Sequence, residues 1–483
     1  MITLMSDTMR HALPLLIAIL VPFSMSAVGG RKPNVLLIYT DDHGQWAAGA
    51  YGNKDVHTPT MDRLAQEGMR FTRGFTKPVC SPSRAMVLTG LYTHRVGIPD
   101  FIAFGNPVKE DVGLPSGTPT IASMLKAAGY ETALVGKWHL GYGPKYYPTK
   151  FGFDHAEGFR YIASDADPAG VGRIPFLVDG KVVPRFRTAT NHTDVLADRA
   201  IDFIEQKRDK PFFLFLSIYL PHLPWGAITD GDKSHYEGRQ LQLPETGAID
   251  EEELLKLTRL YYANITCADR NMGRVLKRLH ELNLRDDTIV IFIGDNGFMV
   301  GQHDLLGKGN ARFIHRGERG KLRRPNMFDD SVLVPFIVRW PGVVKPGTTS
   351  DSLVSTLDVL PTIADAIKLP VFKRPRTDGR SLVPLLRGKA SGWRDAWFDT
   401  YEMVHLGNNG EVPYMRMIRT QDWKLILYNN PDGSPLDSGT RHELFNLRND
   451  PGELTNLFDS PASRAERDKL RIRLNAWMKR QDL

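Results

Sequence analysis

Cysteine is nearly absent from this sequence, which has two, Cys80 and Cys267, among 483 residues. Two cysteines allow at most one disulfide bond, so a small scaffold held together by several disulfides is excluded. A chain of this length has room for a large hydrophobic core. Cys267 lies in a long predicted helix, residues 251–282, and we expect it to be a core residue.

Long apolar runs are absent as well. The apolar stretch at residues 12–21 is too short to cross a bilayer, and no later stretch is long enough. It follows Arg10 and precedes small residues at Ser24 and Ala27, which is the pattern of a signal peptide over residues 1–27. An uncleaved anchor is the alternative interpretation. We expect a mature protein in the periplasm or outside the cell, without a stable membrane span.

Neither sign of charge is in strong excess. The chain has 62 Lys and Arg against 55 Asp and Glu, a formal charge of +7. It contains no nucleic-acid-binding module and no helix with a continuous basic face, so an anionic substrate is favoured over nucleic acid. The length predicts two domains. A connector rich in Pro, Lys and Arg, residues 370–379, separates a predicted catalytic domain, residues 31–375, from a C-terminal subdomain, residues 380–483.

Four apolar runs are each followed by polar residues; they lie at 34–39, 131–135, 211–220 and 288–293. A continuous apolar run is typical of a strand that is covered on both faces. In open α/β sheets the carboxyl ends of such strands form the site. We therefore predict an α/β fold with a large, mostly parallel central sheet flanked by helices, and a smaller C-terminal subdomain with an antiparallel sheet. The polar residues expected at the common edge are Asp41, Asp42, Lys137, His139, His222, Asp295 and Asn296.

Adjacent carboxylates follow the first of these runs. Asp41 and Asp42 repel each other unless a cation lies between them, although a solvated turn is the alternative. Asp295 and Asn296 add two more oxygen ligands. A set of oxygen ligands selects Ca²⁺ or Mg²⁺ and argues against zinc.

The segment around Cys80 is predicted to be a loop that enters a short helix. Ser81 can cap the helix, and Pro82 has the backbone φ of a first helical residue. Cys80 would then face the positive end of the helix, with Arg84 one turn away. This environment favours an anion at position 80, either a thiolate of low pKa or a bound anion. A buried structural cysteine is the alternative.

The sequence Cys80-Ser-Pro-Ser-Arg84, followed by Leu88-Thr-Gly90, resembles the modification signature of the type I sulfatases, in the alkaline-phosphatase-like superfamily. A second stretch, Gly129-Tyr-Glu-Thr-Ala-Leu-Val-Gly-Lys-Trp-His139, resembles the second signature of that family. The resemblance covers nearly the whole mature chain. It implies the sulfatase fold and the hydrolysis of a sulfate ester.

The resemblance also implies the reactive groups. Cys80 would be oxidised by a formylglycine-generating maturation enzyme to Cα-formylglycine (3-oxoalanine), whose hydrate is the nucleophile. A divalent cation, Ca²⁺ with Mg²⁺ as the alternative, would be bound by residue 80 and four side chains. These metal ligands are Asp41, Asp42, Asp295 and Asn296.

Further roles follow from the same resemblance. Arg84 would hold the hydrate, and Asp295 would accept its proton. Lys137 and Lys308 would bind sulfate oxygens. The histidine of the Pro221-His222 element would protonate the departing alcohol, and the base that lets sulfate leave residue 80 would be His139.

The element at residues 301–309 departs from the family pattern at Gln302 and Asp304. A basic insertion follows, so Lys321 is a rival to Lys308 for the sulfate-binding role. The insertion starts at the proposed active site, and its charge predicts a substrate with several negative groups, although a solvated loop is the alternative. Its other basic residues are Arg312, Arg316, Arg319, Arg323 and Arg324.

The predicted function is therefore sulfatase activity on a sulfated carbohydrate. The alternatives are an arylsulfatase that acts on small sulfate esters and a phosphodiester or phosphonate monoester hydrolase on the same fold. A catalytically inactive glycan-binding protein, with Cys80 never converted, is a further possibility of another class. The expected partners are the sulfated small molecule or glycan and the maturation enzyme.

Overall fold

The structure is a computed structural model that describes residues 32–103, 111–159, 176–183, 191–225, 228–244, 249–314, 322–405, 413–434, 436 and 441–483. The predicted signal peptide, residues 1–27, lies outside these ranges. So do Arg316, Arg319 and Lys321 of the basic insertion. Among the described residues, no helix is both long and apolar enough to cross a bilayer.

Within the described residues, ten strands form the central sheet. Strand β1 pairs in parallel with β8 and β9, and β4 pairs in parallel with β8 and β5. Strand β13 runs antiparallel to β9 and β2. The order across the sheet is β14 (Thr348–Ser350), β2 (Met69–Phe71), β13 (Phe336–Arg339), β9 (Thr288–Gly294), β1 (Asn34–Thr40), β8 (Phe212–Ile218), β4 (Glu131–Gly136), β5 (His155–Phe159), β6 (Phe176–Val178) and β7 (Lys181–Val183).

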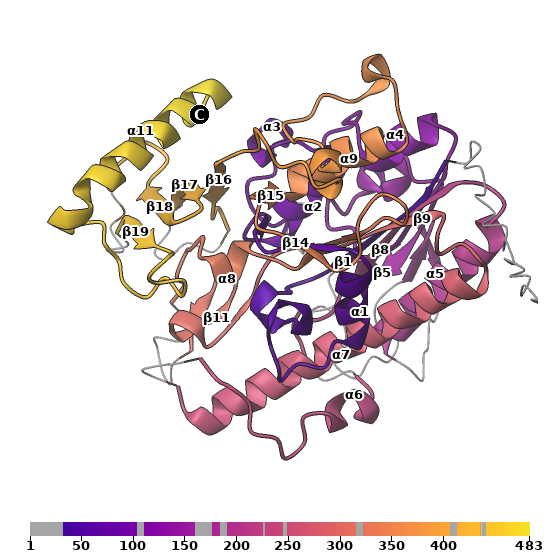
Figure 1. The fold of residues 1–483 in the computed structure, drawn as a ribbon, viewed down its shortest axis with the longest axis horizontal. Helices are drawn as coiled ribbons and strands as arrows, with labels where there is room; N and C mark the ends of the chain where they lie inside the picture. The colour runs from indigo at the N-terminus through magenta and orange to yellow at the C-terminus, as the bar shows by residue number, and fades with distance from the viewer. Residues whose placement is uncertain are drawn as a thin grey trace, which may run out of the picture. The chain divides into compact units, whose positions relative to one another are not determined.

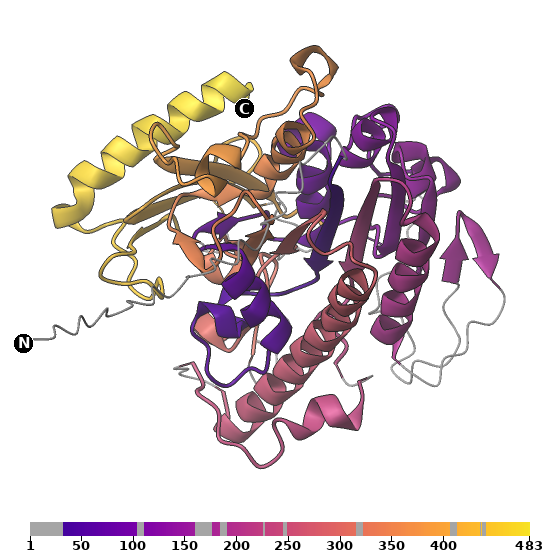
Figure 2. The ribbon, with the colours of Figure 1, turned by 45° about the vertical axis from the view of Figure 1, so that its right-hand side comes forward.

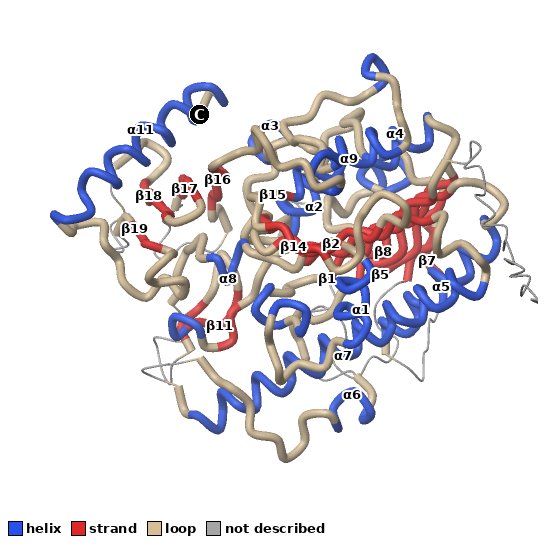
Figure 3. The backbone as a smooth tube through the Cα atoms, viewed as in Figure 1, coloured by secondary structure: helices blue, strands red, loops and turns tan. Residues whose placement is uncertain are grey.

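Helices cover both faces of this sheet (Figures 1 and 3). Helices α2 (Cys80–Thr89), α4 (Ile121–Ala127) and α9 (Val359–Ala366) share a core with one face. Helices α1 (Pro59–Glu67), α5 (His192–Lys207) and α7 (Glu251–Glu281) share a core with the other. Alternate residues of β1 enter the two cores, which explains why its sequence is continuously apolar. The prediction of a mostly parallel α/β sheet is confirmed.

The C-terminal part forms an antiparallel sheet, as predicted. It consists of β16 (Ala396–Glu402), β17 (Tyr414–Thr420), β18 (Trp423–Asn429) and β19 (Glu443–Asn446). Helix α11 (Arg464–Gln481) packs on it through Leu470, Leu474 and Trp477 (Figure 2). The domain boundary near residue 375 stays a prediction.

Shorter elements connect these parts. The strands β10 (Met299–Val300), β11 (Leu305–Gly307) and β12 (Arg312–Phe313) form a small sheet. Its central strand, β11, ends just before Lys308. Strands β3 (Gly74–Phe75) and β15 (Val354–Ser355) pair in parallel. The remaining α-helices are α3 (Thr93–Val96), α6 (Asp230–Ser234), α8 (Asp329–Val332) and α10 (Val383–Leu386).

The prediction that Ser81 caps the short helix next to Cys80 is wrong. Helix α2 begins at Cys80, its N-cap is Val79, and no side chain caps it. The Ser81 hydroxyl instead accepts a hydrogen bond from the backbone N–H of Ile102, at 3.0 Å. A contact with a distant loop has replaced the local cap. The prediction for Cys267 is confirmed, because this residue is fully buried in α7.

Candidate functional site

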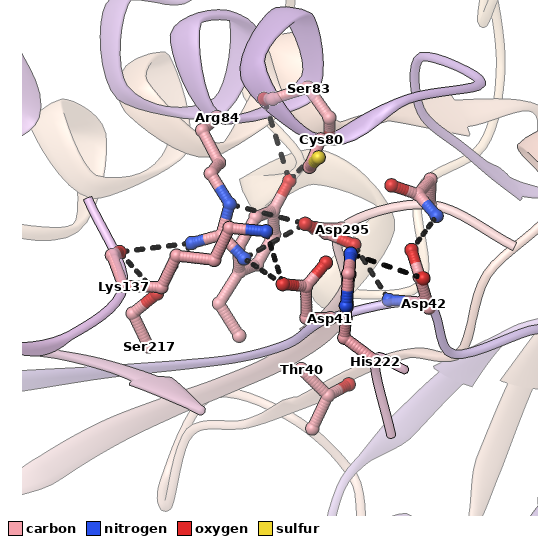
Figure 4. A network of polar contacts seen from close by, with 12 residues as sticks. Thr40, Asp41, Asp42, Cys80, Ser83, Arg84, Lys137, Ser217, His222 and Asp295 are labelled. Carbon is pink, nitrogen blue, oxygen red and sulfur yellow. Dashed lines mark hydrogen bonds and ion pairs between the residues drawn. The ribbon is translucent and has the colours of Figure 1, made fainter. Parts of the chain in front are cut away.

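The carboxyl ends of four neighbouring parallel strands carry the predicted polar residues. Asp41 follows β1, Asp295 follows β9, and Lys137 follows β4. His222 lies four residues beyond the end of β8. These side chains, with those of Cys80 and Arg84 from α2, gather at one edge of the sheet (Figure 4).

Gly136 lets β4 turn into the site. Its φ is +118°, and a Cβ there would lie 1.9 Å from the Ser217 carbonyl oxygen of β8. The next residue, Lys137, donates its backbone N–H to the same oxygen at 2.9 Å. Only glycine allows this close approach of two strands.

Arg84 connects three strand ends from a fully buried position. Its Nε and Nη2 donate to Asp295 Oδ2 at 3.1 and 2.8 Å. Its Nη1 donates to Ser217 Oγ at 2.6 Å and to the Lys137 carbonyl at 3.0 Å. The guanidinium also lies 5.5 Å from the centre of the Tyr39 ring. Because all three nitrogens are bound, the orientation of Arg84 is fixed.

Ser217 is a site residue that the sequence analysis missed. It is fully buried, and its hydroxyl donates to the Lys137 carbonyl at 2.7 Å and accepts from Arg84. The available signal was weak: Ser217 is the one polar residue within the apolar strand β8.

Asp295 is held by Arg84 and by the backbone. The N–H of Asp42 donates to its Oδ1 at 3.0 Å. Burial, with the nearby charge of Asp41, raises the pKa of Asp295 to about 7, although Arg84 and Lys137 act in the opposite direction. This carboxyl group can therefore exchange a proton near neutral pH.

Two lysines pair with the adjacent aspartates. Lys137 Nζ donates to Asp41 Oδ2, and Lys308 Nζ donates to Asp42 Oδ1. Burial alone would raise the pKa of Asp41, but the charges of Lys137, His222 and Arg84 hold it well below its usual value. Asp41 therefore stays ionised despite being buried.

Lys308 also reaches the nucleophile position. Its Nζ lies 3.7 Å from Cys80 Sγ. The neighbouring Gly309 donates its N–H to the Pro78 carbonyl at 3.0 Å, and Asn326 Nδ2 donates to the Lys308 carbonyl at 2.9 Å. These bonds fix Lys308 beside the start of α2. Lys321, the rival for the sulfate-binding role, lies outside the described residues.

The predicted low pKa of the Cys80 thiol is wrong. The residue is 2% exposed, and its burial raises the pKa of the thiol, even though Lys137 and Lys308 lower it. The desolvation of a thiolate outweighs the charges near it. An unmodified Cys80 is therefore a poor thiolate nucleophile.

The two histidines differ in which ring nitrogen is hydrogen-bonded to a backbone carbonyl. His222 Nδ1 lies 2.5 Å from the Leu223 carbonyl, to which it donates, and its Nε2 lies 3.7 Å from Asp42 Oδ2. His139 Nε2 donates to the Ile102 carbonyl at 3.0 Å, and its buried Nδ1 has no hydrogen-bond partner in the described part of the chain. Burial, with the charges of Lys137 and Arg84, holds the pKa of His139 well below its usual value. His139 is thus neutral, with a free acceptor nitrogen.

The carboxylate cluster fits a hard divalent cation. Within the described residues, Asp41 Oδ1 and Asn296 Oδ1 are buried without a hydrogen-bond partner. Ligand atoms of Asp41, Cys80 and Asp295 lie within 4.8 Å of one another, as do those of Asp41, Asp42 and His222. A buried oxygen without a partner is costly, and a bound cation satisfies it. Asp41 belongs to both groups, so an ion that binds Asp41 could also contact the members of either group.

The basic side chains in the described part of the insertion make more contacts with other residues than the sequence suggested. Arg324 pairs with Glu443 of β19 and stacks over the rings of Phe328 and Tyr428, so it joins the C-terminal sheet to the insertion. Arg323 Nη1 donates to the Asn310 carbonyl at 3.1 Å. Among Arg312, Arg323 and Arg324, the described basic side chains of the insertion after Lys308, only Arg312 is exposed.

Comparison with known proteins shows the family to which the chain belongs. The sequence model of a family described as "Sulfatase" matches residues 33–369, and one described as "N-sulphoglucosamine sulphohydrolase, C-terminal" matches residues 317–480. An N-acetylglucosamine-6-O-sulfatase of Bacteroides thetaiotaomicron is 27% identical over 89% of this chain and 83% of its own. The steryl-sulfatase of Rattus norvegicus is 31% identical over 78% of this chain and 74% of its own. A solved structure titled Ps i-CgsB in complex with k-i-k-neocarrahexaose superposes with a TM-score of 0.71, at 26% identity, over 92% of this chain and 93% of that one.

Proposed function

Because the chain belongs to the sulfatase family, a family of sulfuric ester hydrolases, we propose that it removes sulfate from a sulfated carbohydrate at the edge of its central sheet. The observation that carries this proposal is the arrangement around Cys80. A buried nucleophile position lies beside the ammonium of Lys308, at 3.7 Å, and next to a carboxylate cluster that includes Asp41 and Asp295. Such a site combines a nucleophile, cations for an anionic group, and a place for a metal ion.

Residue 80 acts as the nucleophile after conversion of its cysteine to formylglycine. The high pKa of the buried thiol supports this, because the unmodified side chain would be a weak nucleophile. A maturation enzyme has to reach Cys80 before the chain folds, since the folded site leaves it only 2% exposed. Its action on an exported chain is consistent with the signal-peptide pattern of the sequence.

Asp41, Asp42, Asp295 and Asn296 would hold a divalent cation together with residue 80. Their oxygen atoms suit Ca²⁺ or Mg²⁺. When bound, the ion supplies positive charge that stabilises negative charge on the nucleophile and on sulfate oxygens.

The ammonium groups of Lys137 and Lys308 bind sulfate oxygens. Both lysines are buried, so their charges are poorly screened by water and stabilise the charge that builds up on the sulfate group. Arg84 orients Asp295, and Asp295 accepts the proton of the nucleophile.

The two histidines have separate roles in proton transfer. His222, in its imidazolium form, uses the Nε2 proton for the departing alcohol, because its Nδ1 proton is engaged by the Leu223 carbonyl. Burial lowers the pKa of His222, whereas the charges of Asp42 and Asp41 favour the imidazolium. His139 uses its free Nδ1 to take the proton that lets sulfate leave residue 80. The low pKa of His139 keeps it in the neutral form that this step needs.

A carbohydrate is the favoured alcohol. The bacterial relative that is 27% identical is named N-acetylglucosamine-6-O-sulfatase, after a sugar. The solved structure that is 26% identical is titled as a complex with k-i-k-neocarrahexaose. The excess of positive charge in the sequence agrees with an anionic substrate.

The test is to incubate purified, matured protein with a panel of sulfated sugars and aryl sulfates and to measure released inorganic sulfate. The Cys80→Ala variant is the matched control. Sulfate release from a sugar sulfate that Cys80→Ala abolishes is the expected result. Faster hydrolysis of phosphodiesters or phosphonate monoesters than of any sulfate ester would favour the alternative enzyme class.

A further inference from the structure

A basic groove lies between α1, α7 and the end of β13, outside the catalytic site. Its volume is about 640 Å³. Its walls carry one carboxylate, that of Glu67, together with Leu64 and Leu276. The cationic side chains that line it are Arg63, Arg270, Arg274, Lys277, Arg285 and Arg339.

The groove lies at the edge of the sheet opposite to the catalytic residues. Arg285 precedes β9, whereas Asp295 directly follows it. Arg339 ends β13, which runs antiparallel to β9, and it pairs with Val290 near the start of β9. A strand of seven residues, such as β9, spans about 23 Å. A single sugar cannot contact both places, whereas a polymer can.

The floor of the groove is fixed by a close contact between two helices. A Cβ at Gly273 of α7 would lie 2.7 Å from Thr60 Oγ1 of α1. The carboxylate of Asp269, one turn earlier, accepts the backbone N–H groups of Thr60 and Met61 at 2.9 and 2.8 Å. The groove is therefore formed before any ligand arrives.

The guanidinium groups at the floor of the groove are paired with carboxylates, but one N–H group there is left without a partner in the described part of the chain. Glu67 pairs with both Arg285 and Arg339, each at 3.2 Å, and Asp286 pairs with Arg285 at 2.7 Å. Arg339 is 4% exposed, and its Nε has no hydrogen-bond partner among the described residues. An acceptor oxygen near this N–H group would satisfy it.

The rim of the groove is more open. Arg63 is exposed and makes no ion pair within the described ranges. Lys277 is also exposed, with its Nζ 3.5 Å from Glu281. Arg270 and Arg274 are bound by acidic residues of other elements, Asp232 and Asp198 among them. The cations available to a ligand are thus at the rim of the groove.

We propose that this groove binds the chain of a polyanionic polysaccharide, one that carries several sulfate or carboxylate groups. This inference rests on the proposed function, because the groove would hold the same polymer whose sulfate ester is cleaved at the other edge of the sheet. Guanidinium groups match sulfate and carboxylate oxygens with two parallel hydrogen bonds. The described lining includes no Phe, Tyr or Trp, and its one ring is the imidazole of His280, which argues against a single-stranded nucleic acid, whose bases need several stacking partners.

The test uses the full-length, matured protein and the double variant Arg63→Gln/Lys277→Gln. The matched control is Lys256→Gln/Lys389→Gln, which removes two exposed charges outside the groove. Binding to dextran sulfate, with neutral dextran as the reference, is measured at low and at moderate salt. Thermal unfolding and turnover of a sulfated monosaccharide are measured for all three proteins.

We expect the dissociation constant for dextran sulfate to rise about three- to tenfold in the groove variant at low salt, since exposed charge pairs are each weak. The control variant should bind as the unchanged protein does, and turnover of the monosaccharide should be equal in all three. An equal loss in the groove and control variants, or equal binding of neutral dextran, overturns the proposal. If the groove variant alone loses binding but no sulfate ester is cleaved by any protein, the groove stands and the proposed function falls.

Discussion

The ammonium of Lys308 lies 3.7 Å from the sulfur of Cys80, although 228 positions separate the two residues in the chain. The contact places a buried positive charge beside residue 80, the proposed nucleophile position. It also joins two elements from different parts of the chain, the start of α2 and the end of β11. The following predictions test what this arrangement does.

The first prediction concerns Lys308 itself. Lys308→Ala should lower kcat/KM for a sulfate ester by about 10²–10³, the usual effect of removing one preorganised group that stabilises transition-state charge. Lys345→Ala, which removes an exposed lysine, is the control and should be silent. A loss of less than threefold in a correctly folded Lys308→Ala protein would remove this lysine from the sulfate site.

The second prediction concerns the metal ion. Prolonged dialysis against a chelator should abolish activity, because Asp41 Oδ1 and Asn296 Oδ1 would lose the ion that satisfies them. Addition of Ca²⁺ or Mg²⁺ should restore it, and Zn²⁺ should not, since the predicted ligands are oxygens. Full turnover in a sample shown by elemental analysis to lack metal would contradict the assignment.

The third prediction concerns the leaving group. His222→Ala should lower turnover of a sugar sulfate by about 10²–10⁴, and that of an activated aryl sulfate much less, because an aryl oxide leaves without a proton. Both substrates are assayed with the same enzyme preparation. Equal losses on the two would exclude His222 as the general acid.

The fourth prediction concerns stability away from the catalytic residues. Asp269→Asn should lower the free energy of unfolding by about 1–3 kcal/mol, since one backbone N–H at the start of α1 would be left without an acceptor. Chemical denaturation measures the change. Asp209→Asn, at an exposed position, is the control. An Asp269→Asn protein as stable as the control would show that this link between α1 and α7 contributes little.

The sequence predicted the fold and most of the site because the strands carry a strong signal. Strands β1 and β9 are continuous apolar runs, and in a parallel sheet the residues after them must meet at one edge. The positions of Asp41 and Asp295 at one edge of the sheet can be predicted from that rule alone.

The errors have a different origin. Ser81 has a good capping side chain, but a backbone N–H from Ile102 takes its hydroxyl. The pKa of Cys80 depends on how deeply the rest of the chain buries it, which no local pattern records. Ser217 gives almost no signal, because a single serine in an apolar strand is common and its partner, Arg84, lies 133 positions away. Contacts between distant segments determine the partner of Ser81, the pKa of Cys80 and the place of Ser217 in the site.

The most direct test of the account is the chemical state of residue 80 in active protein. The protein is produced together with a formylglycine-generating enzyme, its sulfatase activity is measured, and the peptide that contains residue 80 is analysed by mass spectrometry. We predict that activity rises in proportion to the fraction of residue 80 present as formylglycine. Full sulfatase activity in a preparation that contains only unmodified Cys80 would contradict the account.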